Sequence, residues 1–380
     1  MQSGQVIALN ADGSLAVPDR PLIPVLAGDG VGPEVWAATA PVLEAAVHAA
    51  YGASRALAWQ ATGVGEASST FRAGRVALKG PLAPTTEASL RVELGLRTAV
   101  RPLRWLPGVP AALARPEALD VIFVCDAHGE QADAWPLGDP AVASLVDALA
   151  ARGQGLPAEG LIEARVRDQA AAQAVAGQAL KLAVDRGIER VALVHGPGSG
   201  QRLRAWGYQI AQRDFGPIAV AESDFHADFG GVLPADKRLV VGARLAEDLL
   251  PALLASPADF GVIAALDDAA GSLEAICAAL IGGSWVLPGA LFGEGLAIFE
   301  ATHEADPRSA GQDRANPASL IGAGELLLRH LGWTEAADNV KRGLAGAMAR
   351  RTVTADLHAR ISGSTLRTCS EFGSDVIENM

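Results

Sequence analysis

Short apolar runs alternate with helix-forming segments along the whole 380-residue chain, and this alternation constrains the fold more than any other feature. Residues 119–126 (LDVIFVCD), 191–196 (VALVHG) and 260–267 (FGVIAALD) have the length and composition of buried strands. A turn that contains Gly, Ala or Asp follows each run. Because parallel strands need a crossover between them, usually a helix, the pattern predicts an α/β fold with substantial parallel sheet.

The first of these units illustrates the pattern. Residues 22–27 (LIPVLA) are expected to form a strand, and the helix that follows carries Pro33 and Glu34 in its first turn, where both residues are favoured. The uncharged stretch 275–293 is long enough to span a membrane, but Pro288 and a preceding Gly-Gly-Ser divide it into a short helix and a short strand. We therefore expect buried core there and no membrane span.

Composition and charge exclude several classes of function. The net charge of −12 argues against a nucleic-acid partner or an anionic membrane surface. Three cysteines lie far apart and form no CxxC pair, so neither a disulfide framework nor a zinc site is expected. The chain starts without a basic segment followed by an apolar block, and we expect a cytoplasmic location.

Two glycine-rich segments resemble nucleotide-binding loops only loosely. Residues 27–33 (AGDGVGP) follow a strand and open a helix, but their glycines do not give GxGxxG. Residues 195–202 (HGPGSGQR) lack the GK[ST] of a phosphate-binding loop. A tight structural turn and a flexible connection are the favoured interpretations.

Basic residues gather in one short region of the chain. Arg91, Arg97, Arg101 and Arg104 flank a probable strand. Guanidinium groups match carboxylates and phosphates bidentately, so these residues could form an anion-binding wall. A solvated face explains the cluster equally well, and the residues alone do not decide between the two.

Several longer segments together resemble bacterial NADP-dependent isocitrate dehydrogenase. They include IPVLAGDGVGPEV, LRAWGYQIAQRDFG, FEATH, AGQDRANPASLI, ELLLRHLGWTEAADNV and TCSEFGSDVIENM, and they span nearly the whole chain. The resemblance implies the isocitrate/isopropylmalate dehydrogenase-like fold and a homodimer. Its parts would be a large domain from both chain ends, a small α/β domain and a dimerisation clasp: 1–96 plus 282–380, 97–128 plus 174–281, and 129–173.

The resemblance also implies that the metal site and the proton-transfer groups have been replaced. Gly271, Ala275 and Ala243 align with the three aspartates that hold Mg²⁺ or Mn²⁺ in the family, and none of them has a side-chain oxygen. Gln131 and Pro197 align with the tyrosine and the lysine that transfer protons. No catalytic or metal-binding residue is therefore expected.

Asp267, Asp268 and Glu274 are the acidic residues that could rebuild a metal site nearby. Asp267 and Glu274 are about 10 Å apart along a helix, which disfavours one shared ion.

Some substrate and cofactor contacts are retained. Arg91 and Arg101 match the arginines that grip substrate carboxylates in the family, which implies a residual site for a small carboxylate ligand. His303, Arg308 and Asn316 match cofactor-binding positions, and they predict a residual, weak site for NADP.

The loop that contains His303, Arg308 and Asn316 also carries acidic residues at positions where the family has none. Glu304 replaces the glycine beside the pyrophosphate, and Asp306 lies close by. Added bulk and like charge oppose phosphate binding there, so no cofactor is expected.

Three classes of function remain. The first is an isocitrate dehydrogenase family member that is catalytically inactive and acts as a ligand sensor, a regulator or a subunit in a mixed dimer with an active isocitrate dehydrogenase. The second is an active dehydrogenase with a rearranged site, which uses NADP and Mg²⁺ or Mn²⁺ to oxidise isocitrate or a related 2-hydroxy acid. The third is an unrelated structural or binding role.

Overall fold

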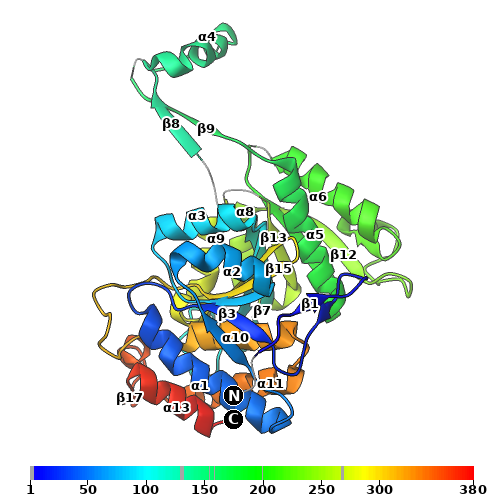
Figure 1. The fold of residues 1–380 in the computed structure, drawn as a ribbon. Helices are drawn as coiled ribbons and strands as arrows, with labels where there is room; N and C mark the ends of the chain where they lie inside the picture. The colour runs from blue at the N-terminus through cyan, green and yellow to red at the C-terminus, as the bar shows by residue number, and fades with distance from the viewer. Residues whose placement is uncertain (1–3, 129–131, 154, 158, 199, 267–268) are drawn as a thin grey trace.

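An 11-stranded mixed sheet forms the centre of the protein, which we describe from a computed structural model (Figure 1). The strand order is β11-β12-β10-β13-β7-β6-β14-β15-β5-β3-β4. In chain order, the strands are β3 Leu22–Leu26, β4 Ala58–Ala61, β5 Val76–Lys79, β6 Thr98–Arg104, β7 Asp120–Asp126, β10 Arg190–His195, β11 Ala219–Ala221, β12 Leu239–Leu245, β13 Val262–Ala265, β14 Pro288–Gly293 and β15 Leu296–Ala301. The structure describes residues 4–128, 132–153, 155–157, 159–198, 200–266 and 269–380.

Two parallel blocks make up this sheet. One block contains β15, β5, β3 and β4, and the other contains β7, β13, β10, β12 and β11. Strands β6 and β14 pair antiparallel with each other and with the neighbouring strands, so they join the blocks into one surface. The expected α/β fold with substantial parallel sheet is confirmed.

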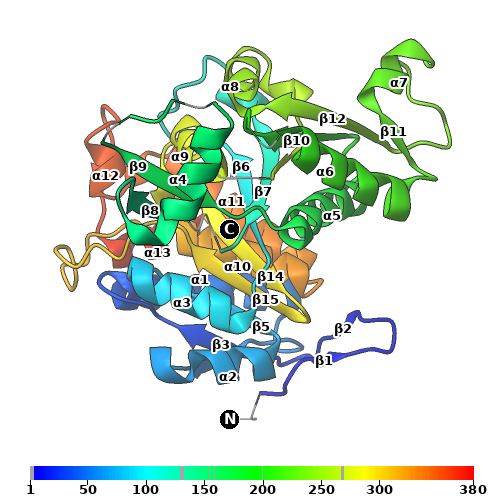
Figure 2. The same ribbon diagram turned by 90° about the horizontal axis from the view of Figure 1, so that it is seen from above.

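Helices cover both faces of the sheet. Their bounds are α1 Gly32–Tyr51, α2 Val64–Gly74, α3 Pro84–Leu94, α4 Ala143–Ala151, α5 Gln169–Arg186, α6 Gly200–Phe215, α7 Glu222–Ala227, α8 Ala246–Ala255, α9 Ala269–Ile281, α10 Ala318–His330, α11 Thr334–Ala349, α12 Ala355–His358 and α13 Cys369–Glu378. Helices α5 and α6 lie side by side in both views (Figures 1 and 2). Helices from both ends of the chain, α1, α11 and α13, pack together.

The stretch that could have been mistaken for a membrane span divides as expected. Helix α9 ends at Ile281 and strand β14 begins at Pro288. Among the described parts of the chain, no helix combines the length and the apolar character needed to cross a membrane.

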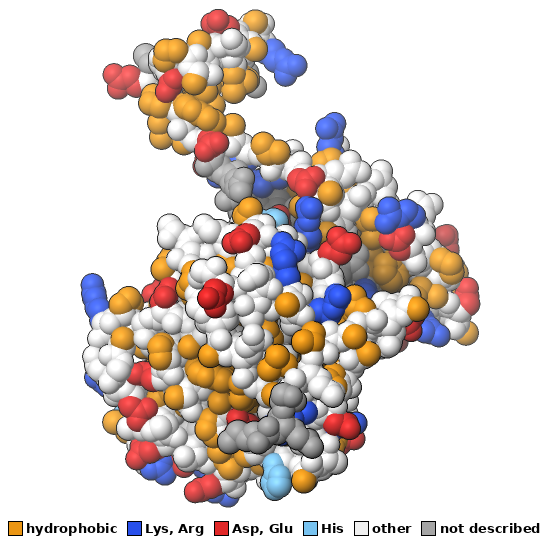
Figure 3. All heavy atoms as spheres, viewed as in Figure 1, with side chains coloured by type: hydrophobic (Ala, Val, Ile, Leu, Met, Phe, Trp, Pro, Cys, Tyr) orange, Lys and Arg blue, Asp and Glu red, His pale blue; other side chains and the backbone are white. Residues whose placement is uncertain are grey.

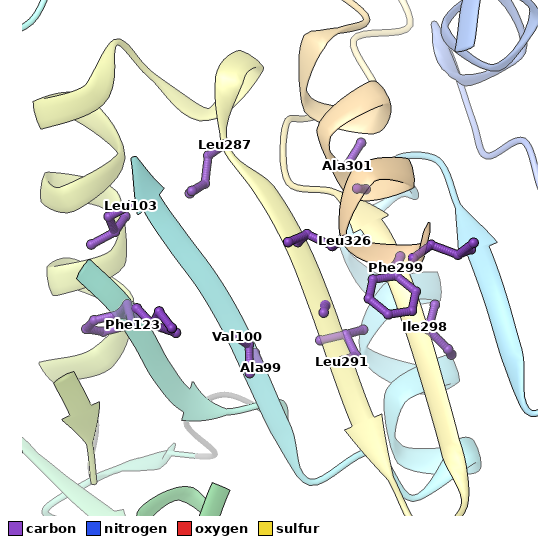
Figure 4. Close-up of a cluster of buried hydrophobic side chains, with 14 of the residues drawn as sticks. Ala99, Val100, Leu103, Phe123, Leu287, Leu291, Ile298, Phe299, Ala301 and Leu326 are labelled. Atoms are coloured by element: carbon purple, nitrogen blue, oxygen red, sulfur yellow. The ribbon is translucent and has the colours of Figure 1, made fainter. Parts of the chain in front are cut away.

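The apolar core lies on the strands that join the two blocks. Figure 4 shows buried side chains of β6, β7, β14 and β15, together with Leu326 of α10. Phe123 and Leu291 are fully buried there, and Phe299 is almost so. Burial of side chains of this size stabilises a fold by roughly 1.5–3 kcal/mol each.

A projecting arm is the most exposed part of the fold. Strands β8 (Ala132–Pro136) and β9 (Leu161–Arg165) pair antiparallel, and α4 lies at the far end of the pair (Figure 1). The arm falls within residues 129–173, the segment predicted to be a clasp. That assignment and the division into a large and a small domain stay predictions, because the sheet runs without interruption across the proposed boundary.

Two short strand pairs and four 3₁₀ turns complete the described part of the fold. They are the pairs β1 Ala8–Leu9 with β2 Leu15–Ala16 and β16 Thr352–Val353 with β17 Thr365–Leu366, and the 3₁₀ turns η1 Pro116–Ala118, η2 Pro140–Val142, η3 Pro257–Asp259 and η4 Ser284–Val286.

Candidate functional site

Glu300 lies at the centre of a buried cluster of charges. It follows the apolar residues of β15 and pairs in register with Lys79 of the parallel strand β5. The Lys79 Nζ donates to Glu300 at 2.9 Å, and the Arg101 Nη2 from β6 donates to the same carboxylate at 2.8 Å. Only 2–3% of each of these three side chains is exposed.

Two more carboxylates complete the cluster. Glu87 of α3 accepts from Lys79 at 2.7 Å and from Arg91 Nε at 2.5 Å. Glu274 of α9 accepts from the Arg101 Nε at 2.7 Å. Three cations therefore meet three carboxylates, and the formal charge of the cluster is zero. We call these six residues the charge cluster: Lys79, Glu87, Arg91, Arg101, Glu274 and Glu300.

The ionisation of the cluster follows from this pairing. Burial alone would raise the pKa of Glu300, but attraction to Lys79, Arg91 and Arg101 outweighs burial and holds the pKa well below its usual range. Burial would likewise lower the pKa of Arg101, and the carboxylates of Glu274 and Glu300 raise it instead. Glu300 and Arg101 are therefore charged at neutral pH.

A polar cavity of about 460 Å³ lies beside the charge cluster. Arg91 and Glu274 reach its wall from the cluster, and Gly271 of α9 lines it together with Cys125 of β7. Burial raises the pKa of the Cys125 thiol to about 12, so this thiol is not a nucleophile at neutral pH. The cavity thus brings together a predicted substrate arginine, Arg91, and Gly271, which aligns with a metal-binding aspartate of the family.

The arginine cluster of the sequence divides in two. Arg91 and Arg101 belong to the charge cluster, whereas Arg97 and Arg104 are exposed, and Arg104 pairs with Asp120. The solvated-face interpretation holds for Arg97 and Arg104, whereas Arg91 and Arg101 pair with carboxylates of the chain itself. Whether Arg91 and Arg101 bind an external anion stays a prediction.

The sequence reasoning did not find the partners of these arginines. Glu87 and Glu300 were not singled out, and Glu274 was considered only as a metal ligand. A signal was present, because Lys79 and Glu300 are charged residues at the ends of two otherwise apolar strands. Such residues are expected to be paired when they are buried.

The described carboxylates around the cavity are engaged within the chain. Asp126 and Glu274 are the cavity carboxylates nearest the cluster, and Glu274 is occupied by Arg101 while Asp126 accepts from the His128 backbone N–H at 3.0 Å. Asp168 caps α5 by accepting from Ala170 N at 2.9 Å. Within the described residues, no three His, Cys, Asp or Glu side chains gather as a metal site.

The structure also places several other residues that were compared with the family's metal and proton-transfer positions. Gly271 and Ala275 lie on α9, and Ala243 lies on β12. Asp267, Asp268 and Gln131 lie outside the described residues.

In the predicted cofactor loop, the side chains of His303 and Asn316 contact other residues of the chain. His303 is buried and stacks on Trp285, with ring centroids 4.0 Å apart. Asn316 is also buried; its Nδ2 donates to Asp356 at 3.0 Å, and its Oδ1 accepts from the backbone N–H of Ala318.

Two charged side chains of the loop face solvent. Arg308 and Glu304 are exposed. Of the three residues predicted to contact NADP, only Arg308 is thus directly accessible. Among the described residues of the loop, the Nε2 of His303 is the buried side-chain polar atom that has no hydrogen-bond partner.

The glycine-rich turn at residues 27–33 holds this loop in place. The backbone N–H of Val31 donates to Ala305 O at 2.7 Å, and Glu34 accepts from the backbone N–H of Ala315 at 3.1 Å. Gly30 adopts a φ of +57°, and a Cβ there would lie 2.0 Å from the Ala305 carbonyl oxygen. The turn is therefore structural, as the sequence reasoning favoured.

Replacing Glu300 by Gln should destabilise the protein by roughly 3–5 kcal/mol, because three buried cations would then share two carboxylates. Urea unfolding of the parent and the Glu300→Gln variant measures the difference. Asp214→Asn removes an exposed carboxylate that pairs with Arg213 and should leave the free energy of unfolding almost unchanged. A loss in Glu300→Gln no larger than in Asp214→Asn would contradict the prediction.

The stability of the fold should also depend on the ionisation of His303. Burial lowers the pKa of this imidazole to about 4, although the carboxylate of Asp356 opposes the shift. Below about pH 6.5 the unfolded chain binds a proton that the folded chain takes up only near pH 4. The contribution is therefore fully present above pH 6.5 and is lost as the pH falls toward 4. We expect a loss of about 2 kcal/mol between pH 7 and pH 5.

His303→Phe should retain the stacking on Trp285 and remove this part of the pH dependence, as urea unfolding at the two pH values would show. His358→Gln, at an exposed position, is the matched control and should keep the parent's slope. His330, whose pKa burial also lowers to about 4, contributes equally to all three proteins. An unchanged slope in His303→Phe would refute the assignment.

Known proteins resemble this chain over its whole length. The family model described as isocitrate/isopropylmalate dehydrogenase matches residues 22–376. The NADP-dependent isocitrate dehydrogenase of Pseudomonas aeruginosa is 34% identical, and the match covers 100% of this chain and 98% of that protein. The corresponding protein of Haloferax volcanii is 30% identical, with coverage of 99% and 96%.

A solved structure agrees with the architecture. The crystal structure of isocitrate dehydrogenase from Methylococcus capsulatus superimposes with a TM-score of 0.70 at 20% identity, and the match covers 94% of this chain and 99% of that one. At this identity the likeness shows the fold alone. Together with the family match over residues 22–376, it confirms the resemblance found in the sequence. The chain belongs to the isocitrate/isopropylmalate dehydrogenase family.

Proposed function

We propose that this protein is a catalytically silent member of its family, which keeps the fold but does not oxidise isocitrate. The observation that carries the proposal is the 2.7 Å contact between Glu274 and the Arg101 Nε. The family resemblance assigns this arginine to a carboxylate of the substrate. In this protein a carboxylate of the chain itself holds it, and Glu300 holds the same guanidinium from the other side.

The positions of the catalytic machinery support the same conclusion. Gly271 and Ala275 provide no side-chain oxygen on the helix beside the cavity, and Ala243 provides none on β12. Mg²⁺ and Mn²⁺ need hard oxygen ligands. Each missing general acid or base removes a factor of about 10²–10⁴ in rate.

A ligand-sensing role would use the charge cluster differently from catalysis. A small carboxylate that enters the polar cavity has to compete with Glu274 for Arg101. Glu274 is the most exposed of the three carboxylates, at 26%, so it is the one that a ligand can displace. In this role Arg91 and Arg101 form the residual anion site, and His303, Arg308 and Asn316 form at most a weak NADP site.

A partner-subunit role would use the projecting arm. Leu161, Leu145 and Val166 are exposed on or beside it, and Figure 3 shows hydrophobic side chains gathered there. Exposed apolar patches mark interaction surfaces. We propose a homodimer through this clasp, or a mixed dimer with an active isocitrate dehydrogenase.

One observation favours an active enzyme as the alternative. The relative from Pseudomonas aeruginosa carries NADP in its name, and its match covers the whole of this chain. In this alternative the protein is an NADP-dependent dehydrogenase of isocitrate or a related 2-hydroxy acid, with a metal site built from other residues.

The decisive test is NADPH formation from isocitrate and Mg²⁺ by protein purified away from the host's own isocitrate dehydrogenase. We expect no rate above the protein-free control. A rate that is proportional to protein concentration and disappears in Arg101→Ala would overturn the proposal in favour of the active enzyme.

Calorimetry with isocitrate gives the matched binding test. Glu274→Gln removes the competing charge, so this variant should bind isocitrate about tenfold or more tightly than the parent. Asp126→Asn removes a carboxylate from the same cavity without freeing Arg101 and serves as the control. Equal affinities in all three proteins would mean that Glu274 does not occupy the anion site. Tight, saturable binding of NADP would contradict the prediction that the loop forms at most a weak NADP site.

The arm should determine the oligomeric state. We expect a dimer of the parent in light scattering after size exclusion, and a shift toward monomer in Leu161→Asp, because a charge at this exposed apolar position opposes burial. Val92→Asp, at an exposed apolar position away from the arm, is the control and should stay dimeric. A monomeric parent excludes the homodimer. Co-purification with a full-length isocitrate dehydrogenase would then favour the mixed dimer over a stand-alone sensor.

A further inference from the structure

A second cavity, of about 390 Å³, lies on the other side of the sheet from the Arg101 guanidinium. Pro102 and Arg104 of β6 and Ile122 of β7 line it, and the side chains of a strand alternate between the two faces of a sheet. Residue 101 therefore points to one face and residues 102 and 104 to the other. The volume falls within the range of small-molecule sites, roughly 300–1,000 Å³.

The floor of this second cavity is apolar. It is formed by buried side chains of β7, η4, α10 and α11 and of the residue before β7: Leu119, Ile122, Val286, Leu326 and Leu344. Trp105 adds its ring to the lining, and its Nε1 already donates to the Val109 carbonyl at 2.7 Å. The polar edge of the ring is thus satisfied, and the cavity offers a ligand mainly apolar surface.

The rim of the cavity is charged, and part of it neutralises itself. Arg104 pairs with Asp120 at 2.9 Å. Arg329 pairs with Glu325, its neighbour one turn earlier on α10. These two ion pairs therefore add no net charge to the rim.

Two cations of the rim remain without a carboxylate. Arg186, at the end of α5, and Lys341, on α11, make no hydrogen bond or ion pair in the part of the chain that the structure describes. Glu117 is the lining carboxylate without a partner among the same residues, so the uncompensated charge of the rim is positive. Partial burial, with smaller contributions from the like charges of Arg104 and Arg329, lowers the pKa of Arg186 from its usual range, although the Glu325 carboxylate opposes this shift; a bound anion would oppose it further.

We propose that this cavity binds an amphipathic monocarboxylate, whose aliphatic or aromatic body covers the apolar floor and whose carboxylate lies at the rim with Arg186 and Lys341. A guanidinium and an ammonium both favour a carboxylate, and the guanidinium can bind it with two parallel hydrogen bonds. The inference goes beyond the proposed function. It uses neither the charge cluster nor the cofactor loop, so it stands whether or not the protein oxidises isocitrate.

Titration calorimetry with octanoate tests the proposal, with octan-1-ol as the uncharged probe of the same chain length. Octanoate should bind saturably at one site per chain. Octan-1-ol should bind about tenfold or more weakly, because it leaves both cations unpaired. Absence of saturable octanoate binding, or equal affinities for the two probes, would overturn the proposal.

Variants then locate the site. Arg186→Gln and Lys341→Gln should each weaken octanoate binding about fivefold and leave octan-1-ol binding unchanged. Ala345→Phe fills the cavity from α11 and should abolish binding of both probes. Arg342→Gln removes a cation from the same helix outside the cavity and should have no effect. If Ala345→Phe leaves octanoate binding intact, or if Arg342→Gln weakens it as much as Arg186→Gln does, the ligand binds elsewhere. Should the filled variant fail to fold, the three charge variants decide.

Discussion

The buried carboxylate of Glu300 is the interaction on which the rest of the structure depends. It holds the cations of β5, α3 and β6 at one point of the sheet, and Glu87 and Glu274 bring the total charge to zero. An isolated charge at this depth would cost several kcal/mol, so each member of the charge cluster requires the others. The cluster thus joins five elements from both halves of the chain beside the polar cavity. It also means that the cations near this cavity are already paired within the chain.

The loop that resembles a cofactor site keeps its shape through contacts with the rest of the fold, whether or not it binds a nucleotide. Its shape depends on the turn at residues 27–33, where Gly30 lies against the Ala305 carbonyl and Glu34 binds backbone N–H groups of the loop. Asn316 likewise accepts from the backbone N–H of Ala318, the first residue of α10, and donates to Asp356. Such contacts are needed by the fold with or without a nucleotide. Retained residues in this loop are therefore weak support for cofactor binding, whereas the exposed Glu304 and Arg308 are the positions at which binding would be decided.

The two faces of β6 and β7 offer different chemistry. On one face, Arg101 is fully paired beside a polar cavity. On the other face, the same strands form the floor of an apolar cavity with unpaired cations at its rim. Strand alternation produces this division, because adjacent residues of one strand must face opposite sides. A family fold can in this way keep its framework while the site on one face closes and a site on the other face remains open to a ligand.

The sequence by itself determined the order of strands and helices, the structural nature of the turn at residues 27–33, and the family. These features depend on local pattern and on segments that stay together along the chain. The local pattern also brought out Arg91 and Arg101 as candidates. It did not show that Glu274, 173 residues after Arg101, would hold its guanidinium. Only the tertiary structure decided this pairing, because it depends on how α9 packs over β6, and the same acidic residue two positions away would have faced another side of the helix.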